Sequence, residues 1–288
     1  MRLSVSEGSR NNLCLTGQGM CLVTSLNKQG SGSMLNGLSH IFIELTNRCD
    51  KHHLCSMCGR QKGIIEYGDM NWTILCQIAR QVPPNIIVSF HRNGEPTAYP
   101  FLGQAIGLFR DNITSIVTHG LNLIEKADEI IGNCTTVVFS RFEFDADRDE
   151  QLRILKEFIE IKGGKSPQII VKYIGEFNEE RLPGVIYTSR SLHSAKDSKD
   201  YKAHDPVIPE SGVCLDLLST LSIDWNGDVY ICNRKNPAGL LGNAYDDTLS
   251  DLWNGRKRQE YIAAHKAGLR QNTELCKTCQ YWGIPVSF

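Results

Sequence analysis

Three cysteines lie close together in the first quarter of the chain. Five residues separate Cys49 from Cys55, and two separate Cys55 from Cys58. The apolar and β-branched run Ile41–Leu45 comes just before them and predicts a strand, so we expect the thiols in a loop at its carboxyl end. Three thiolates can hold a metal centre and leave one coordination position open, which a reactive metal needs and a purely structural one lacks.

Zinc is the alternative for this loop. His52 and His53 could supply a fourth ligand of a tetrahedral site. A zinc knuckle is compact, however, whereas more than 100 residues with alternating strand and helix patterns follow here. The spacing therefore favours a reactive centre over zinc.

A second set of four cysteines lies in the last quarter of the chain. Two predicted strands, 220–224 and 228–232, flank Asn226-Gly227, which is a strong hairpin signal. A predicted helix at 248–267 follows. The four cysteines are Cys214, Cys232, Cys276 and Cys279. They can enclose one metal centre, and from their spacing alone both zinc and an iron–sulfur cluster remain open.

Composition excludes several classes of protein. The formal net charge is −1, from 31 Lys and Arg against 32 Asp and Glu, and gives no support for a nucleic-acid or anionic-membrane partner. No apolar run approaches the roughly 20 residues of a membrane helix, and no secretory signal is evident. Eleven cysteines in a chain expected to be cytoplasmic favour metal ligation over disulfides.

The middle of the chain alternates strands and helices. Predicted strands cover 40–46, 85–92, 114–120, 135–144, 168–175 and 184–190, and predicted helices cover 70–82, 101–111, 123–133 and 147–164. Repeated βα units imply a parallel sheet with right-handed crossovers, so we expect an α/β fold with a partial (β/α)6 TIM-like barrel. In such barrels the chemistry lies at the carboxyl ends of the strands.

Two other strand ends carry chemically useful residues. Gly94-Glu95-Pro96 follows the second strand, where a glycine and a proline fix a turn that aims one carboxylate into the barrel mouth. Such an anion could bind an ammonium group, although the tripeptide alone also suits a surface turn. His119 and Gly120 follow the third strand, where the glycine permits close backbone approach.

The three cysteines after the first strand and the Gly-Glu-Pro turn after the second resemble the radical S-adenosylmethionine (SAM) superfamily. The resemblance implies a 4Fe–4S cluster on Cys49, Cys55 and Cys58, with SAM on the open iron. It further implies SAM contacts from Met57, from Gly94, Glu95 and Pro96, and from Ser140 and Arg141 at the end of the fourth strand. One departure is the C-x5-C-x2-C spacing, since the family spacing is C-x3-C-x2-C.

The resemblance continues into the last quarter. The hairpin with Gly-Asp-Val-Tyr-Ile-Cys and the Cys-x2-Cys near the end resemble the SPASM/twitch extension of radical SAM enzymes, in the shorter twitch form. This implies a second, auxiliary 4Fe–4S cluster on the four C-terminal cysteines. The expected organisation is a poorly ordered tail (1–38), the barrel (39–190), a linker (191–212) and a twitch domain of β-hairpin and helix (213–288).

The implied function is reductive cleavage of SAM to a 5′-deoxyadenosyl radical, which abstracts hydrogen from a substrate C–H bond. An electron-accepting auxiliary cluster would make this a net oxidation of a small polar, sugar-like or aminocyclitol-like substrate, with an electron donor such as flavodoxin or ferredoxin. Radical modification of a ribosomally made peptide and a non-catalytic zinc or iron–sulfur scaffold are the alternatives. By their strand-end positions Arg141, His119 and His91 are candidates to touch substrate, and the first two are the predicted catalytic residues.

Overall fold

The computed structural model describes a sheet-based α/β fold. The described residues are 12–16, 19–23, 35–51, 66–143, 145–179, 181–190, 212–233, 237–277 and 279. A short antiparallel hairpin near the N-terminus pairs β1 (Asn12–Thr16) with β2 (Gly19–Val23). This hairpin lies within the segment predicted to be poorly ordered.

One nine-stranded sheet organises the rest of the described chain. Its strands are β3 (His40–Ile43), β4 (Ile87–Phe90), β5 (Ile113–Thr118), β6 (Thr136–Phe142), β7 (Gln168–Ile174), β8 (Ile186–Arg190), β9 (Thr220–Ile223), β10 (Asp228–Tyr230) and β11 (Leu240–Asn243). The order across the sheet is β11-β10-β9-β3-β4-β5-β6-β7-β8. All neighbours from β9 to β8 are parallel, and β10 and β11 are antiparallel additions at one edge.

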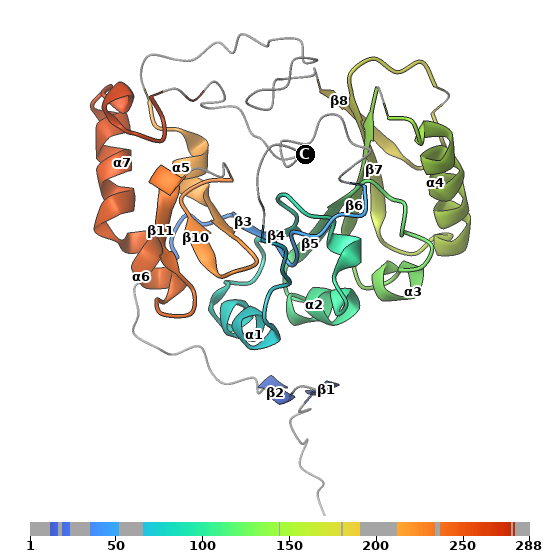
Figure 1. Cartoon of the computed structure of the whole chain (residues 1–288), viewed down its shortest axis with the longest axis horizontal. Coiled ribbons are helices and arrows are strands. Elements are labelled where there is room, and N and C mark those ends of the chain that lie inside the picture. The colour runs from blue at the N-terminus through green and yellow to red at the C-terminus, as the bar shows by residue number, and fades with distance from the viewer. Residues whose placement is uncertain are drawn as a thin grey trace, which may run out of the picture.

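The helices lie outside the curve of the sheet (Figure 1). They are α1 (Trp72–Gln81), α2 (Leu102–Leu108), α3 (Ala127–Ile130), α4 (Arg148–Lys162), α5 (Leu215–Ser219), α6 (Leu249–Asn254) and α7 (Arg256–Lys266). Short 3-10 helices cover Pro96–Ala98, Pro237–Gly239 and Arg270–Asn272. None of the described helices is long and apolar enough to cross a bilayer.

Alternation along the strands separates two faces of the sheet. On β4, Val88 and Phe90 are fully buried in the large apolar core beneath the helices, whereas Ser89 points to the opposite face. Helix α1 contributes Ile74, Leu75 and Ile78 to the same core and begins at Asn71, whose side chain accepts a hydrogen bond from the Thr73 N–H at 2.9 Å. The second face lines the inside of the curved sheet, which is the lumen of the partial barrel.

The predicted fold class is confirmed, since the sheet is an open, mostly parallel barrel-like α/β structure. The C-terminal hairpin is part of the same sheet, because β9 runs parallel to β3 with Thr220 opposite His40. The single helix predicted at 248–267 is wrong: the chain forms α6 and α7, with Gly255 in extended conformation between them. A Cβ at Gly255 would lie 2.9 Å from the Asp251 carbonyl oxygen, so only glycine fits this break.

Candidate functional site

The segment with the first three cysteines is closed at its base by backbone pairing. The Asn47 N–H donates to the Gly68 carbonyl at 3.2 Å, and the Met70 N–H donates to the Leu45 carbonyl at 2.7 Å. The Asn47 amide group also bridges the two sides, accepting from the Gly68 N–H and donating to the Glu66 carbonyl. Residues 45–47, which lead out of β3, are therefore paired with residues 68–70, where the chain returns. Cys55, Met57 and Cys58 lie between, outside the described residues.

The Gly94-Glu95-Pro96 turn is packed against the start of this segment. A Cβ at Gly94 would lie 2.0 Å from the Thr46 carbonyl oxygen, so a side chain there is excluded. The Glu95 N–H donates to the Arg48 carbonyl at 2.8 Å. Pro96 begins a 3-10 helix that Glu95 caps. The turn after β4 and the residues leading to Cys49 thus form one unit.

The Glu95 carboxylate is buried and held from two sides. Its Oε1 accepts hydrogen bonds from the Thr97 N–H at 3.1 Å and the Thr97 hydroxyl at 2.7 Å. Its Oε2 accepts from the His119 N–H at 3.0 Å. Thr97 lies in the 3-10 helix that follows β4, and His119 directly follows β5, so the carboxylate is fixed at the carboxyl edge of the sheet.

His119 lies between two carboxylates and Cys49. Its Nε2 is 2.8 Å from Asp50 Oδ1 and 3.2 Å from Glu95 Oε2. Burial alone would lower the pKa of His119, but the negative charges of Glu95 and Asp50, with hydrogen bonds to Asp50 and Cys49, raise that pKa to about 10. The ligand atoms of Cys49, Asp50 and His119 all lie within 4.8 Å of one another, so these three could hold a metal ion together.

Ser140 and Arg141 point to opposite faces of β6. Ser140 is buried and lies opposite Lys172 in the pairing of β6 with β7, on the lumen side. Arg141 is fully buried, forms an ion pair with Glu179 and donates to the Arg148 carbonyl at 2.7 Å. Its guanidinium also stands 5.5 Å from the Phe177 ring centroid. The structure thus brings Ser140, but not Arg141, toward the lumen.

A cavity of about 100 Å³ lies against the lumen face of β3 to β7. Its polar lining includes His40, Ser89, His91 and Ser115, and the remainder is mainly isoleucine and valine. Burial lowers the pKa of His40 to about 4 and that of His91 to about 3, and for His91 the nearby positive charges of Lys172 and Arg92 add to the effect. Both rings are therefore neutral at pH 7, and His40 Nε2 is 2.7 Å from the Ser89 hydroxyl.

Three cysteines of the second set lie in or against a small core near the C-terminus. Cys232 and Cys276 are buried there, and Cys214 is packed against the same cluster. Burial raises the pKa of Cys276 to about 11, and negative charge on Cys279 and Cys214 adds to the rise. Cys276 thus lies within electrostatic reach of both thiols. Thiols are soft donors that suit a metal cluster.

Polar groups beside this core hold the cysteine backbone. Arg270 Nη1 donates to the carbonyls of Cys276 and Cys279 at 3.3 and 3.5 Å. The Cys214 N–H donates to His265 Nδ1 at 3.3 Å. These contacts fix the Cys-x2-Cys turn and the residue before α5 relative to the end of α7.

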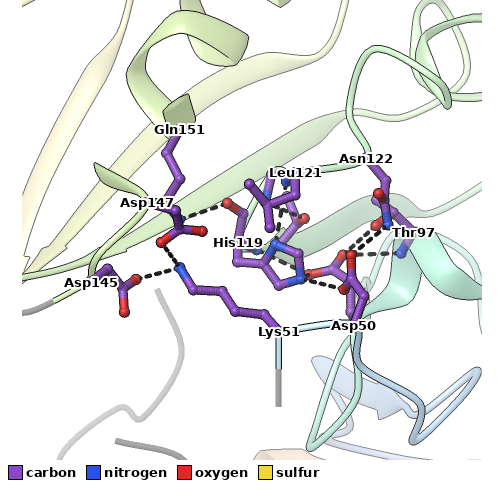
Figure 2. Close-up of polar contacts among 12 residues, drawn as sticks. Asp50, Lys51, Thr97, His119, Leu121, Asn122, Asp145, Asp147 and Gln151 are labelled. Carbon is purple, nitrogen blue, oxygen red and sulfur yellow. Dashed lines mark hydrogen bonds and ion pairs between the residues drawn. The ribbon is translucent and has the colours of Figure 1, made fainter. Parts of the chain in front are cut away.

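Several site residues were missed from the sequence. Glu44 accepts from the N–H and side-chain amide of Asn93, and Arg92 forms a buried ion pair with Asp224 after β9. Asp50 and Lys51 reach to the loops after β5 and β6 (Figure 2). Asp50 and Lys51 directly follow Cys49 in the sequence, and this position could have indicated that they belong to the site. The partners of Arg92 and Lys51 lie 132 and 94 residues away, and no local pattern indicates them.

Comparison with known proteins identifies the C-terminal domain. Residues 214–280 match the SPASM family, described as an iron-sulfur cluster-binding domain. This range contains all four cysteines of the second set. No curated protein matches the chain significantly.

Solved structures share the fold over most of the chain at low sequence identity. BtrN in complex with AdoMet and 2-DOIA is 19% identical, with 84% of this chain and 92% of that chain covered and a TM-score of 0.58. Hexahistidine-tagged anSMEcpe with bound AdoMet is 14% identical, covering 84% and 83%, with a TM-score of 0.55. Native anSMEcpe with bound AdoMet and Cp18Cys peptide is 15% identical, covering 84% and 86%, with a TM-score of 0.53. The predicted resemblance is thus confirmed in the fold and in the C-terminal domain.

Proposed function

We propose that this chain, with its SPASM domain and the fold of structures that hold AdoMet, is a radical SAM enzyme that oxidises a substrate C–H bond. The observation that supports it most strongly is the packing of Gly94 and Glu95 against Thr46 and Arg48, just before Cys49. A turn carrying a buried carboxylate and a cysteine loop are thereby joined at the carboxyl edge of a parallel sheet, where barrels of this kind carry out chemistry.

The residues present fit a cluster and SAM at this edge. Cys49, Cys55 and Cys58 would hold a 4Fe–4S cluster with one open iron for SAM. When bound, this pair supplies the one-electron cleavage of the sulfonium C–S bond. Glu95, fixed by Thr97 and His119, presents a carboxylate to the SAM ammonium group. Gly94 lets the turn that carries Glu95 pack against the Thr46 backbone, just before Cys49.

Further contacts to SAM are proposed at the other strand ends. Pro96 holds the turn, Ser140 faces the lumen beside β7, and Met57 would pack on the adenine. His119 is held at the mouth of the lumen by Asp50 and Glu95, and is the better candidate to touch substrate. The contacts of Arg141 support a positioning role, because its guanidinium joins β6 to α4 and to Glu179.

The second cysteine set is proposed to hold an auxiliary 4Fe–4S cluster. Cys232 and Cys276 lie in one small core with Cys214 packed against it, and Cys279 follows Cys276 by three residues, so each of the four iron atoms of such a cluster has a candidate thiol. This leaves no open iron for substrate, and electron transfer or structural support is the role that remains. A net oxidation, which leaves an electron to be removed, suits the first of these. The electron donor is proposed to be a flavodoxin or ferredoxin.

A small polar substrate is the first candidate. The lumen cavity has a volume of about 100 Å³ and is lined by five residues with hydroxyl or imidazole groups among apolar side chains. A peptide is the second candidate, because a structure of anSMEcpe with a bound peptide shares this fold over 84% of the chain.

The activity test uses anaerobically prepared protein with dithionite and SAM. The proposed function predicts 5′-deoxyadenosine and methionine in equal amounts, absent from Cys49→Ala. Adding a panel of aminocyclitols, or alternatively cysteine- and serine-containing peptides, should increase the rate with one panel only. If no 5′-deoxyadenosine forms with any preparation, the function as a radical SAM enzyme is wrong and the scaffold alternative stands.

A further inference from the structure

The chain after β3 crosses the carboxyl ends of three neighbouring strands in turn. The Arg48 carbonyl accepts from the Glu95 N–H, after β4, at 2.8 Å. Asp50 contacts His119 at 2.8 Å and Asn122 at 3.2 Å, both after β5. Lys51 Nζ is 2.6 Å from Asp145 Oδ2 and 2.7 Å from Asp147 Oδ1, both after β6. Each step along the chain thus meets the next strand of the sheet.

The distances explain why a lysine stands at the last position. Neighbouring strands are about 4.8 Å apart, so the ends of β4 and β6 are separated by roughly 10 Å. Asp50 and Lys51 lie in a turn, so the backbone from 48 to 51 covers less than this distance. The long, flexible side chain of Lys51 completes the span to the two aspartates.

The ion pairs of Lys51 are enclosed in the protein. The side chains of Lys51, Asp145 and Asp147 are 3%, 1% and 18% exposed. A lysine this buried is held by its partners, because an unpaired buried charge is strongly unfavourable. Its position, two residues after Cys49, is therefore determined by the loop between β6 and α4.

A second connection closes the contacts into a ring (Figure 2). The Gln151 side chain in the first turn of α4 is fully buried, and its Nε2 donates to the His119 carbonyl at 2.9 Å. His119 contacts Asp50, and Asp147 at the start of α4 contacts Lys51. In this ring, Asp50 is held by His119 after β5 and Lys51 is held by Asp147 at the start of α4.

We propose that Lys51 is a positioning residue for the SAM-binding cluster: its ion pairs with Asp145 and Asp147 hold the segment after Cys49 across the ends of β4 to β6, and so orient the Cys49 thiolate. The inference rests on the proposed function, because it needs a cluster at Cys49. Two of the five residues between Cys49 and Cys55, Asp50 and Lys51, contact the loops after β5 and β6 in this way.

The test compares iron binding and SAM binding in reconstituted full-length protein. Lys51→Met keeps the length of the side chain and removes its charge. We expect the iron whose binding depends on Cys49 to fall at least twofold. We also expect the SAM concentration that changes the electron paramagnetic resonance spectrum of the reduced protein to rise at least tenfold. Lys51→Arg should restore more than half of each loss, a rescue that general destabilisation would not produce.

Two further variants keep the test decisive. Lys126→Met removes a lysine that is 2.6 Å from Glu129 at α3, far from the cysteines in sequence, and should match the parent. Asp147→Asn serves as the test if Lys51→Met does not fold. It leaves Asp145 paired with Lys51 and should change the iron content and the SAM response in the same direction, but by less. Parent-like iron and SAM response in Lys51→Met and Asp147→Asn would overturn the inference. A parent without Cys49-dependent iron would instead overturn the proposed function, and this inference with it.

Discussion

At the scale of single residues, Glu95 has two tasks that depend on one carboxylate. It caps the 3-10 helix through Thr97 and receives the His119 N–H, so it fixes the ends of β4 and β5. In the proposed function the same charge attracts the SAM ammonium group. A charged partner strengthens such an interaction, and hydrogen bonds to charged groups contribute about 1.5–3 kcal/mol.

Glu95→Gln keeps the shape and removes the charge. We expect the dissociation constant for SAM to rise about 10- to 100-fold, because the loss of about 1.5–3 kcal/mol corresponds to that range. Equilibrium binding to the iron-loaded protein measures it. Thr97→Val is the matched control: it removes a hydroxyl that braces Glu95 but leaves the charge, and should weaken binding less. Unchanged SAM affinity in Glu95→Gln would remove Glu95 from the proposed site.

His40 predicts a pH dependence of stability. Burial lowers its pKa to about 4, so the folded chain resists a proton that the unfolded chain binds below about pH 6.5. The stabilising contribution is complete above pH 6.5 and is lost as the pH falls toward 4. Urea unfolding at pH 7.5 and pH 5 should therefore show a larger loss of stability in the parent than in His40→Gln. Equal losses would show that His40 does not cause the acid sensitivity.

At the scale of secondary-structure elements, a buried ion pair joins the β4 end to the C-terminal hairpin. The side chains of Arg92 and Asp224 are 1% and 2% exposed, and the Arg92 guanidinium stands 4.8 Å from the Tyr230 ring centroid. Asp224 follows β9 directly, and β9 pairs with β3. The pair therefore stabilises the junction between the barrel strands and the hairpin that leads to Cys232.

Arg92→Met should destabilise the chain by about 3–5 kcal/mol, because it removes one charge of a buried ion pair and leaves the other in place. Arg153→Met is the control, since Arg153 and Glu150 are 60% and 50% exposed and solvent screens such a pair, so its loss should change stability little. Urea denaturation measures both. In the double variant Arg92→Met/Asp224→Asn the loss should be smaller than the sum of the single losses. Additive effects would mean that the two side chains do not stabilise each other.

The elements predictable from sequence were those with a local pattern. The βα repeats followed from alternation and helical periodicity, and β9 and β10 from the strands around Asn226-Gly227. The pairing of β9 with β3 was not predictable, because it joins residues 180 positions apart. Strand β11 and the break at Gly255 were missed. The break had a signal in the glycine itself, but helical periodicity on both sides concealed it.

At the scale of the whole molecule, one sheet carries both cysteine sets. Cys49 follows β3, and Cys232 lies two residues after β10, which pairs with the β9 strand beside β3. The lumen face of the same sheet contains the cavity with His40 and His91. The architecture thus provides a rigid support on which a reaction at the first set and electron transfer at the second could be combined.

The candidate site was predictable only where the types of neighbouring residues and their spacing form a recognisable pattern. The cysteine sets and Gly94-Glu95-Pro96 carry such signals, and the SPASM match confirms the iron–sulfur domain. The partners of Lys51 and Arg92 were not predictable, because their identity depends on which strand ends meet in the fold. The orientation of Arg141 away from the lumen depends on a one-residue shift in strand alternation, which sequence does not define at a strand end.

The central claim is that the two cysteine sets hold two separate 4Fe–4S clusters. Its most direct test is the iron and acid-labile sulfide content of anaerobically reconstituted protein. The account predicts about eight iron atoms per parent chain, and about four each in Cys49→Ala and Cys276→Ala. Zinc in place of iron, or iron content that neither substitution changes, would contradict it.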